Sequence, residues 1–159
     1  MVEKPVVKLV PLYSKSGSGK RVTASLLKSI YPELGKYHEF IAGPETNYTV
    51  LRDALKGRKW FAIENASKEI VGAIALTPRK KEGWVGRLFI SEEYRKQEYA
   101  NAAINALKQH ATRKGIRELH AYIAHVNEPS RKAFTKAGFR ENPSMKDTHG
   151  KVFTHKNRK

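Results

Sequence analysis

The chain has 159 residues, of which 31 are Lys or Arg and 15 are Asp or Glu, so its formal charge is +16. A hydrophobic fraction of 40% with 29% charged residues is typical of one folded domain and excludes a disordered polymer. The lack of Cys excludes disulfides, thiolate metal sites and a cysteine nucleophile. We expect a single domain over residues 1–159 and a polyanionic partner, such as nucleic acid, an acidic protein or a phosphorylated cofactor.

The sequence gives no sign of membrane insertion or export. No apolar run reaches the length that crosses a bilayer. The first ten residues, MVEKPVVKLV, lack the apolar core and the cleavage site of an export signal. We therefore expect no membrane partner and a cytoplasmic location.

Six strands are predicted from apolar and β-branched runs that lie between polar turns. They cover residues 6–13, 59–66, 69–79, 83–91, 117–125 and 151–156. Short polar turns at 65–69 and 79–83 join the second, third and fourth strands, which predicts an antiparallel meander.

Four helices are predicted from apolar residues at helical spacing. They cover a segment that starts at Thr23 and reaches Pro32, then 47–57, about 99–114, and 129–138. The third is strongly amphipathic, with Ala103 and Leu107 on one face and Gly115 as its stop. Asn127 is expected to cap the fourth helix, and Gly138 to end it.

The loop over residues 14–20 and the segment SGSGKRVT at 16–23 invite comparison with a phosphate-binding P-loop. That motif requires Gly-x4-Gly-Lys-Ser/Thr, but Ser14 and Arg21 occupy the first glycine and the Ser/Thr positions. We interpret the segment as a basic loop. The six His are scattered without metal-ligand spacing, so no metal site is predicted.

The stretch GRLFISEEYRKQEYANAAINAL contains the first of two motifs that resemble a known family. Leu88, Phe89 and Ile90 end a strand. Arg95 and Ala100 then lie at the two ends of a turn that opens a helix.

The second motif is NEPSRKAFTKAGF. Asn127 and Ser130 match an Asn-x-x-Ser segment, and Lys136, Gly138 and Phe139 match the Lys-x-Gly-Phe that follows it. Both motifs, in this order and after a three-strand meander, resemble the GNAT acyltransferase superfamily.

The resemblance implies an α+β fold with a mixed, mostly antiparallel sheet of six to seven strands. In that fold helices flank the sheet, and its fourth and fifth strands splay apart to hold acyl-CoA. The implied function is acyl-CoA-dependent transfer, most simply of an acetyl group from acetyl-CoA to a primary amine. The implied cofactor-binding residues are Leu88, Phe89, Ile90, Arg95, Lys96, Gln97, Glu98, Tyr99, Ala100, Asn127, Ser130 and Lys136.

The sequence departs from the family pattern at two positions. Glu98 stands where the family has glycine, and its carboxylate would repel a pyrophosphate by roughly 3–4 kcal/mol at about 4–6 Å. Arg95 and Lys96 offset that repulsion. Phe134 stands where many members have a tyrosine that protonates the departing thiolate, so we expect Phe134 to pack against the sheet.

The catalytic base stays open, because the fourth strand has no carboxylate in WVGRLFI. Candidates are Glu64, His120, Tyr122 and His125, and a water chain or a backbone carbonyl is an equal alternative. The charge suggests an acceptor amine on a polyanion such as nucleic acid or a ribosomal component. Two other hypotheses remain: a catalytically degenerate nucleic-acid-binding module, and an acyltransferase whose donor is aminoacyl-tRNA.

Overall fold

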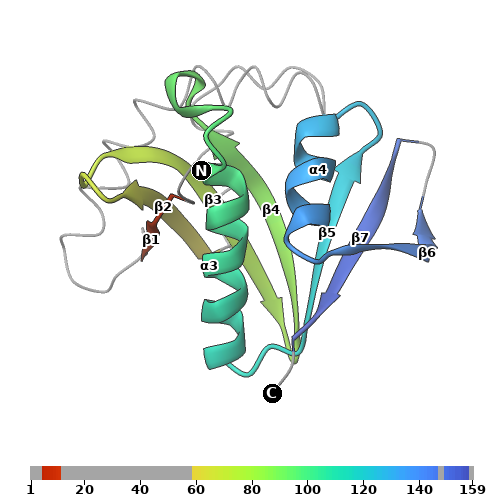
Figure 1. The fold of residues 1–159 in the computed structure, drawn as a ribbon. Helices are drawn as coiled ribbons and strands as arrows, with labels where there is room; N and C mark the ends of the chain where they lie inside the picture. The colour runs from red at the N-terminus through yellow and green to blue at the C-terminus, as the bar shows by residue number, and fades with distance from the viewer. Residues whose placement is uncertain (1–4, 12–58, 147–148, 158–159) are drawn as a thin grey trace, which may run out of the picture.

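The computed structural model describes residues 5–11, 59–146 and 149–157 (Figure 1). The described elements are β1 Val7–Pro11, β2 Lys59–Asn65, β3 Ile70–Arg79, β4 Glu82–Ile90, the 3-10 turn η1 Glu92–Tyr94, α3 Tyr99–Arg113, β5 Glu118–Ala124, α4 Glu128–Lys136, β6 Arg140–Lys146 and β7 Gly150–Lys156. The P-loop-like segment and the helices predicted from Thr23 and over 47–57 lie outside these ranges.

The described strands form one sheet in the order β1-β2-β3-β4-β5-β7-β6. Its neighbouring strands are antiparallel except β4 and β5, which are parallel. The prediction of a mixed, mostly antiparallel sheet of six to seven strands is therefore confirmed. The meander of β2, β3 and β4 is also confirmed, because short turns connect strands that differ in direction.

Strand β6 is the element that the six predicted strands did not include. Its sequence, RENPSMK, contains Pro143 and lacks alternating apolar residues. It pairs with β7 only through Arg140, Glu141 and Lys146, and the register shifts between Glu141 and Lys146. An irregular edge strand of this kind leaves no periodic signal in the sequence.

Strands β4 and β5 pair over only part of their length. The parallel register joins Glu82–Val85 to Glu118–Ala121 and goes no further. Beyond that point β4 continues to Ile90 and β5 continues to Ala124, and the two strands diverge upward in Figure 1. The predicted splay is thus confirmed, and each strand presents a backbone edge to the resulting V.

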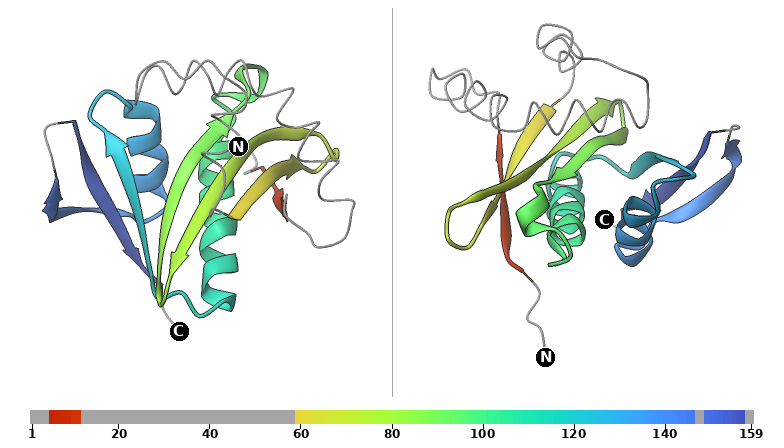
Figure 2. Two further views of the ribbon diagram at one scale, coloured as in Figure 1. Left: turned by 180° about the vertical axis from the view of Figure 1, so that it is seen from behind. Right: turned by 90° about the horizontal axis from the view of Figure 1, so that it is seen from above.

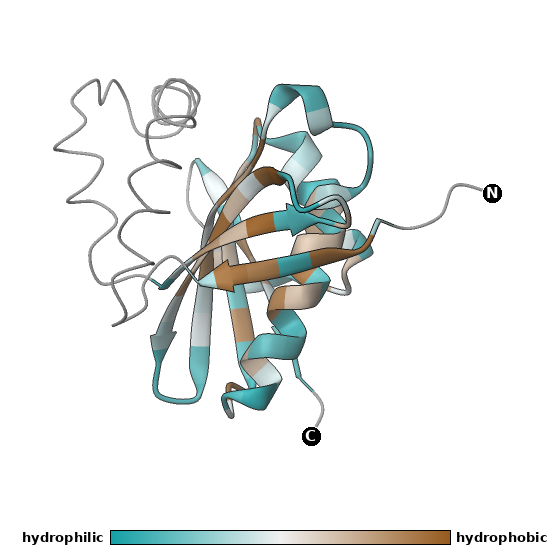
Figure 3. Cartoon of the chain, turned by 90° about the vertical axis from the view of Figure 1, so that its left-hand side faces the viewer, coloured by the Kyte–Doolittle hydropathy of each residue, from teal (hydrophilic) through white to brown (hydrophobic). Residues whose placement is uncertain are grey.

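Helices α3 and α4 lie on one face of the sheet and supply much of the core (Figure 2). The inward face of α3 buries Ala103, Ile104, Leu107 and Ala111 completely. These residues join Leu119 and other buried strand residues in one apolar cluster. Burial of each large apolar side chain contributes about 1.5–3 kcal/mol. The most hydrophobic residues concentrate on the strands, α3 carries both apolar and polar residues, and the turns are polar (Figure 3).

A polar seam fixes the spacing of α3 and α4. The buried Asn101 donates its side-chain N–H to the carbonyl of Ala133 at 3.2 Å. About two turns later, the Lys108 ammonium donates to the carbonyl of Ala137 at 2.7 Å. Burial lowers the pKa of Lys108. The seam holds α4, and with it one wall of the V, against the helix that starts at the other wall.

Strands β3 and β4 approach each other closely at Gly72. A Cβ at this position would lie 2.0 Å from the carbonyl oxygen of Phe89, so only glycine fits. The register shifts just beyond it, between Ala73 and Ala75. This irregularity lies beside the last residues of β4, where the V is open.

The described helices include none that is long and apolar enough to cross a membrane.

Candidate active site

A cavity of about 710 Å³ lies at the open end of the V. Of the expected cofactor-binding residues, all but Gln97 line it. Gln97 is exposed instead and donates its side-chain N–H to the carbonyl of Glu93 at 3.3 Å. The sequence motifs did not indicate the other lining residues, which are Tyr94, Asn101, Val126, Pro129, Lys132 and Ala133.

A second, smaller cavity of about 40 Å³ lies deeper in the V. It shares Leu88, Asn127 and Ser130 with the larger cavity, so the two adjoin along β4 and the start of α4. Its walls include residues from both strand edges: Val85, Gly86, Leu88, Ala121, Tyr122, Ile123 and Ala124. An extended molecule can therefore run from the mouth of the V to the point where β4 and β5 meet.

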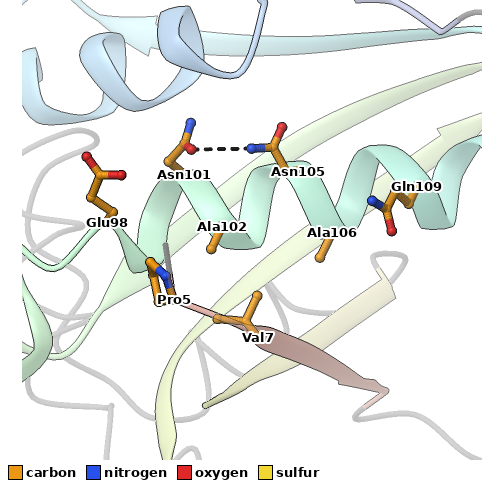
Figure 4. A pocket seen from close by; sticks show the side chains of 8 residues that line it. All are labelled: Pro5, Val7, Glu98, Asn101, Ala102, Asn105, Ala106 and Gln109. Atoms are coloured by element: carbon orange, nitrogen blue, oxygen red, sulfur yellow. Dashed lines mark hydrogen bonds between the residues drawn. The ribbon is translucent and has the colours of Figure 1, made fainter. Parts of the chain in front are cut away.

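A third cavity, of about 250 Å³, lies on the other side of the α3 N-terminus, between β1 and the helix (Figure 4). Ala102 and Ala106 point toward β1, whereas Asn101 and Asn105 point toward α4 and are joined by a hydrogen bond of 3.3 Å. Glu98 borders both this cavity and the large one. The first turn of α3 therefore separates the third cavity from the large one.

The turn before α3 exposes the positive end of the helix to the large cavity. The helix begins at Tyr99, and its first N–H groups have no acceptor within the helix. Lys96 and Glu98 have φ of 62° and 66°, the left-handed conformation that favours glycine. This arrangement suits an anion, because N–H groups and the helix dipole act in the same direction.

Arg95 connects this turn to β4. Its Nε donates to the carbonyl of Ile90 at 2.9 Å, and its guanidinium carbon lies 5.9 Å from the centre of the Phe89 ring. Arg95, Lys96, Lys132 and Lys136 give the cavity four cations. Within this cavity, Glu98 is the one carboxylate among the described lining residues.

Glu98 occupies the N-cap position of α3, but its side chain makes no capping hydrogen bond. Its carboxylate instead forms an ion pair with Lys136, in the last turn of α4. The pair spans 38 residues of sequence and joins the two walls of the V. Sequence reasoning placed both residues at the cofactor site but did not indicate that they bind each other.

Tyr94 forms another wall of the cavity and is held from the β2–β3 turn. Its hydroxyl donates to Glu69 Oε2 at 2.9 Å, which lowers the pKa of Glu69 and raises that of Tyr94. Its ring meets Tyr99 edge-to-face at 6.0 Å. Asn65 accepts hydrogen bonds from the backbone N–H groups of Ser67 and Glu69, which fixes the turn that carries Glu69.

The N-terminus of α4 forms the opposite side of the mouth. The Asn127 side chain accepts a hydrogen bond from the backbone N–H of Ser130 at 3.3 Å, so the predicted cap is confirmed. Phe134 is 4% exposed and meets Phe139 edge-to-face at 5.0 Å, as expected for packing. It also borders the smaller cavity, where it offers no hydroxyl.

The candidate bases lie in different places. Tyr122 lines the smaller cavity. Glu64 lies on β2, which β3 separates from β4, and it borders none of the three cavities. His125 is exposed after β5, where its backbone N–H donates to the carbonyl of His149 at 2.9 Å. Of these three, Tyr122 alone borders a cavity of the V, and its hydroxyl lies beside Gly150 of β7.

His120 is buried at the closed end of the V. Its Nδ1 lies 2.8 Å from Thr154 Oγ1, and its Nε2 lies 3.6 Å from Glu82 Oε2 and 3.7 Å from Glu118 Oε2. The sequence did not reveal this cluster, since Glu82 and His120 come from different strands. Its members line none of the three cavities.

Comparison with known proteins identifies a family and a fold. The family model described as acetyltransferase (GNAT) family matches residues 27–139. No protein with a curated description matches the chain. Three similar solved structures illustrate the fold.

A variant of spermidine N-acetyltransferase from Vibrio cholerae has a TM-score of 0.71 at 14% identity, covering 95% of this chain and 94% of that one. The same enzyme in complex with CoA and spermine has a TM-score of 0.68 at 13% identity, covering 97% and 96%. GCN5 from Tetrahymena has a TM-score of 0.70 at 15% identity, covering 95% and 96%. At these identities the likeness shows the fold.

Proposed function

The chain belongs to the acetyltransferase (GNAT) family, whose co-substrate is acetyl-CoA, and from this premise we propose that it is an N-acetyltransferase acting on a primary amine. The observation that carries the proposal is the V itself. Two strand edges, a helix N-terminus and four cations line two adjoining cavities between β4 and β5. Its volume of about 710 Å³ falls within the range of roughly 300–1,000 Å³ that is usual for small-molecule sites.

The residues of the V fit an extended, phosphorylated thioester. The edge of β4 from Gly86 to Ile90 offers backbone groups to the amides of the cofactor arm, as an added strand would. The N–H groups of Tyr99 and Ala100 and the side chains of Arg95 and Lys96 would hold its phosphates. Acetyl-CoA supplies an acetyl group activated as a thioester.

The acceptor amine must lose a proton before it attacks, because its pKa is near 10. We assign proton transfer to Tyr122, since it is the candidate base that borders the narrow cavity where the strands part; its hydroxyl lies beside Gly150 of β7 and would have to turn toward the cavity to act. Phe134 borders the same cavity but has no proton to donate. The edges of β4 and β5 position the two reactants, which lowers the entropic part of the barrier.

The acceptor is an amine carried by a polyanion, such as a nucleic acid or a ribosomal component. The spermidine acetyltransferases that share the fold act on a polycation, but a chain of charge +16 repels such a molecule. The same charge attracts an amine that lies on an anionic carrier. Because salt screens this attraction, the rate of capture should fall as the salt concentration rises.

Calorimetry and acetyl transfer test this function together. We expect micromolar binding of acetyl-CoA at low salt, and faster transfer to a lysine-bearing acidic peptide than to spermidine. Equal or faster transfer to spermidine would refute the polyanionic acceptor. Absence of acetyl-CoA binding, together with salt-dependent binding of nucleic acid, would favour the degenerate binding module instead.

A further inference from the structure

The ion pair between Glu98 and Lys136 lies where the phosphates of the cofactor would enter. Both side chains line the large cavity, and both are about half exposed, at 43% and 50%. One belongs to the N-cap of α3 and the other to the last turn of α4. The contact therefore links the α3 side of the V to the α4 side.

The local backbone shows that this contact has a cost. Glu98 has φ of 66° and ψ of 16°, a conformation in which a side chain is strained and glycine is not. Its carboxylate also makes no capping hydrogen bond to the first N–H groups of α3. Strain that persists at a ligand-binding turn points to a role there.

The charges of the cavity indicate what that role is. Arg95, Lys96, Lys132 and Lys136 line it together with a single carboxylate, Glu98. Lys132 also has a partner outside the cavity, Glu128, whose carboxylate lies 3.6 Å away. Glu98 is thus the anion that Lys136 contacts inside the cavity, at the position that suits a phosphate.

We propose that Glu98 is a built-in competitor for the cofactor's phosphates, which holds Lys136 until a phosphate displaces it. On binding, Lys136 exchanges the carboxylate for a phosphate oxygen, and the freed Glu98 carboxylate turns away toward solvent. No covalent bond changes in this exchange. The inference rests on the proposed function, because it assumes that CoA enters this cavity. It predicts that the wild-type chain binds CoA more weakly than a chain with glycine at position 98.

The test is the affinity for CoA, measured by calorimetry at low and moderate salt. Glu98→Gln removes the carboxylate charge and keeps the side-chain length, so we expect binding to tighten by about threefold to tenfold at low salt and by less at moderate salt. Glu92→Gln is the matched control. It makes the same change in net charge on the neighbouring turn, but Glu92 lines none of the three cavities.

A double-mutant cycle separates exchange of partners from simple repulsion. Lys136→Gln should weaken CoA binding more in the Glu98→Gln background than in the wild-type chain. When Glu98 is present, Lys136→Gln removes the phosphate contact but also removes the ion pair that CoA would have to break. The loss of CoA affinity is therefore smaller than in the Glu98→Gln background. An equal effect in both backgrounds would overturn the exchange.

Failure of this inference differs from failure of the proposed function. If the wild type binds CoA and Glu98→Gln binds it no more tightly than Glu92→Gln does, the competitor is refuted and the function stands. If neither the wild type nor Glu98→Gln binds CoA at low salt, both are refuted.

Discussion

At the scale of single residues, the turn before α3 carries two non-glycine residues in the left-handed conformation, Lys96 and Glu98. The sequence marked Glu98 as a departure from the family pattern, and its left-handed φ explains why glycine is usual there. Its partner could not be predicted, because Lys136 lies 38 residues away and only the packing of α3 and α4 brings the two together. The contact between Tyr94 and Glu69, which lie 25 residues apart, escaped prediction for the same reason.

The strain at Glu98 can be measured by comparing two substitutions. Glu98→Gly and Glu98→Ala both remove the ion pair with Lys136, but only glycine adopts φ of 66° without strain. We expect the Gly variant to be more stable than the Ala variant by about 1 kcal/mol, which raises the midpoint of thermal unfolding by about 2–4 °C. An Ala variant at least as stable as the Gly variant would contradict this.

Proton transfer by Tyr122 is a second prediction for a single residue. Tyr122→Phe keeps the ring and removes the hydroxyl, so kcat for acetyl transfer should fall by about 100-fold while the Kd for acetyl-CoA stays unchanged. Glu64→Gln and His125→Gln should leave kcat within about twofold, because neither residue lines a cavity of the V. Retention of kcat in Tyr122→Phe would exclude the hydroxyl from the reaction.

At the scale of elements, most of what periodicity and turn chemistry encode was predictable. The helix expected over 99–114 is α3, and the stops at Gly115 and Gly138 have φ of 78° and 93°. What sequence patterns could not predict depends on contacts between elements. Strand β6 forms because β7 offers it an edge, although its own sequence is irregular. The cluster of His120, Glu82 and Glu118 likewise forms only where β4 meets β5.

The close approach of β3 and β4 gives an element-scale prediction. Gly72→Ala would place a Cβ 2.0 Å from the Phe89 carbonyl oxygen, so the strands must move apart and the free energy of unfolding should fall by about 2–3 kcal/mol. Gly86→Ala is the matched control, since nothing lies within 4 Å of its added Cβ, and we expect a change within about 0.5 kcal/mol. Denaturant unfolding of both variants checks this. Similar losses in the two would show that β3 and β4 can separate at little cost.

At the scale of the whole molecule, the burial of two His, together with nearby cations, lowers the stability of the protein in acid. Burial, followed by nearby cations, lowers the pKa of His110 and of His155. The unfolded chain therefore binds more protons than the folded one between the lowered values and about 6.5. The contribution of these two His to the free energy of unfolding is fully present above about pH 6.5. It is lost as the pH falls from there through the lowered pKa values.

The thermal midpoint between pH 8 and pH 5 tests this linkage. We expect the midpoint of the wild type to fall below about pH 6.5 and that of the double variant His110→Gln/His155→Gln to fall less over the same range. The His155 ring packs beside the Phe139 ring at 5.4 Å, and the His110 ring meets the Phe61 ring at 4.9 Å. Both substitutions therefore cost the double variant some stability at every pH. The pH slope is therefore the quantity to compare, and identical slopes would rule out these two groups.

The parting of β4 and β5 also has a consequence for self-association. An unpaired strand edge on the outside of a protein can capture a strand from another molecule and seed aggregation. Here the parts of β4 and β5 that do not pair with each other, Gly86 to Ile90 and Tyr122 to Ala124, face each other across a cleft that α3 and α4 border on one side. The fold thus keeps hydrogen-bonding groups available to an extended small molecule while hiding them from neighbouring chains.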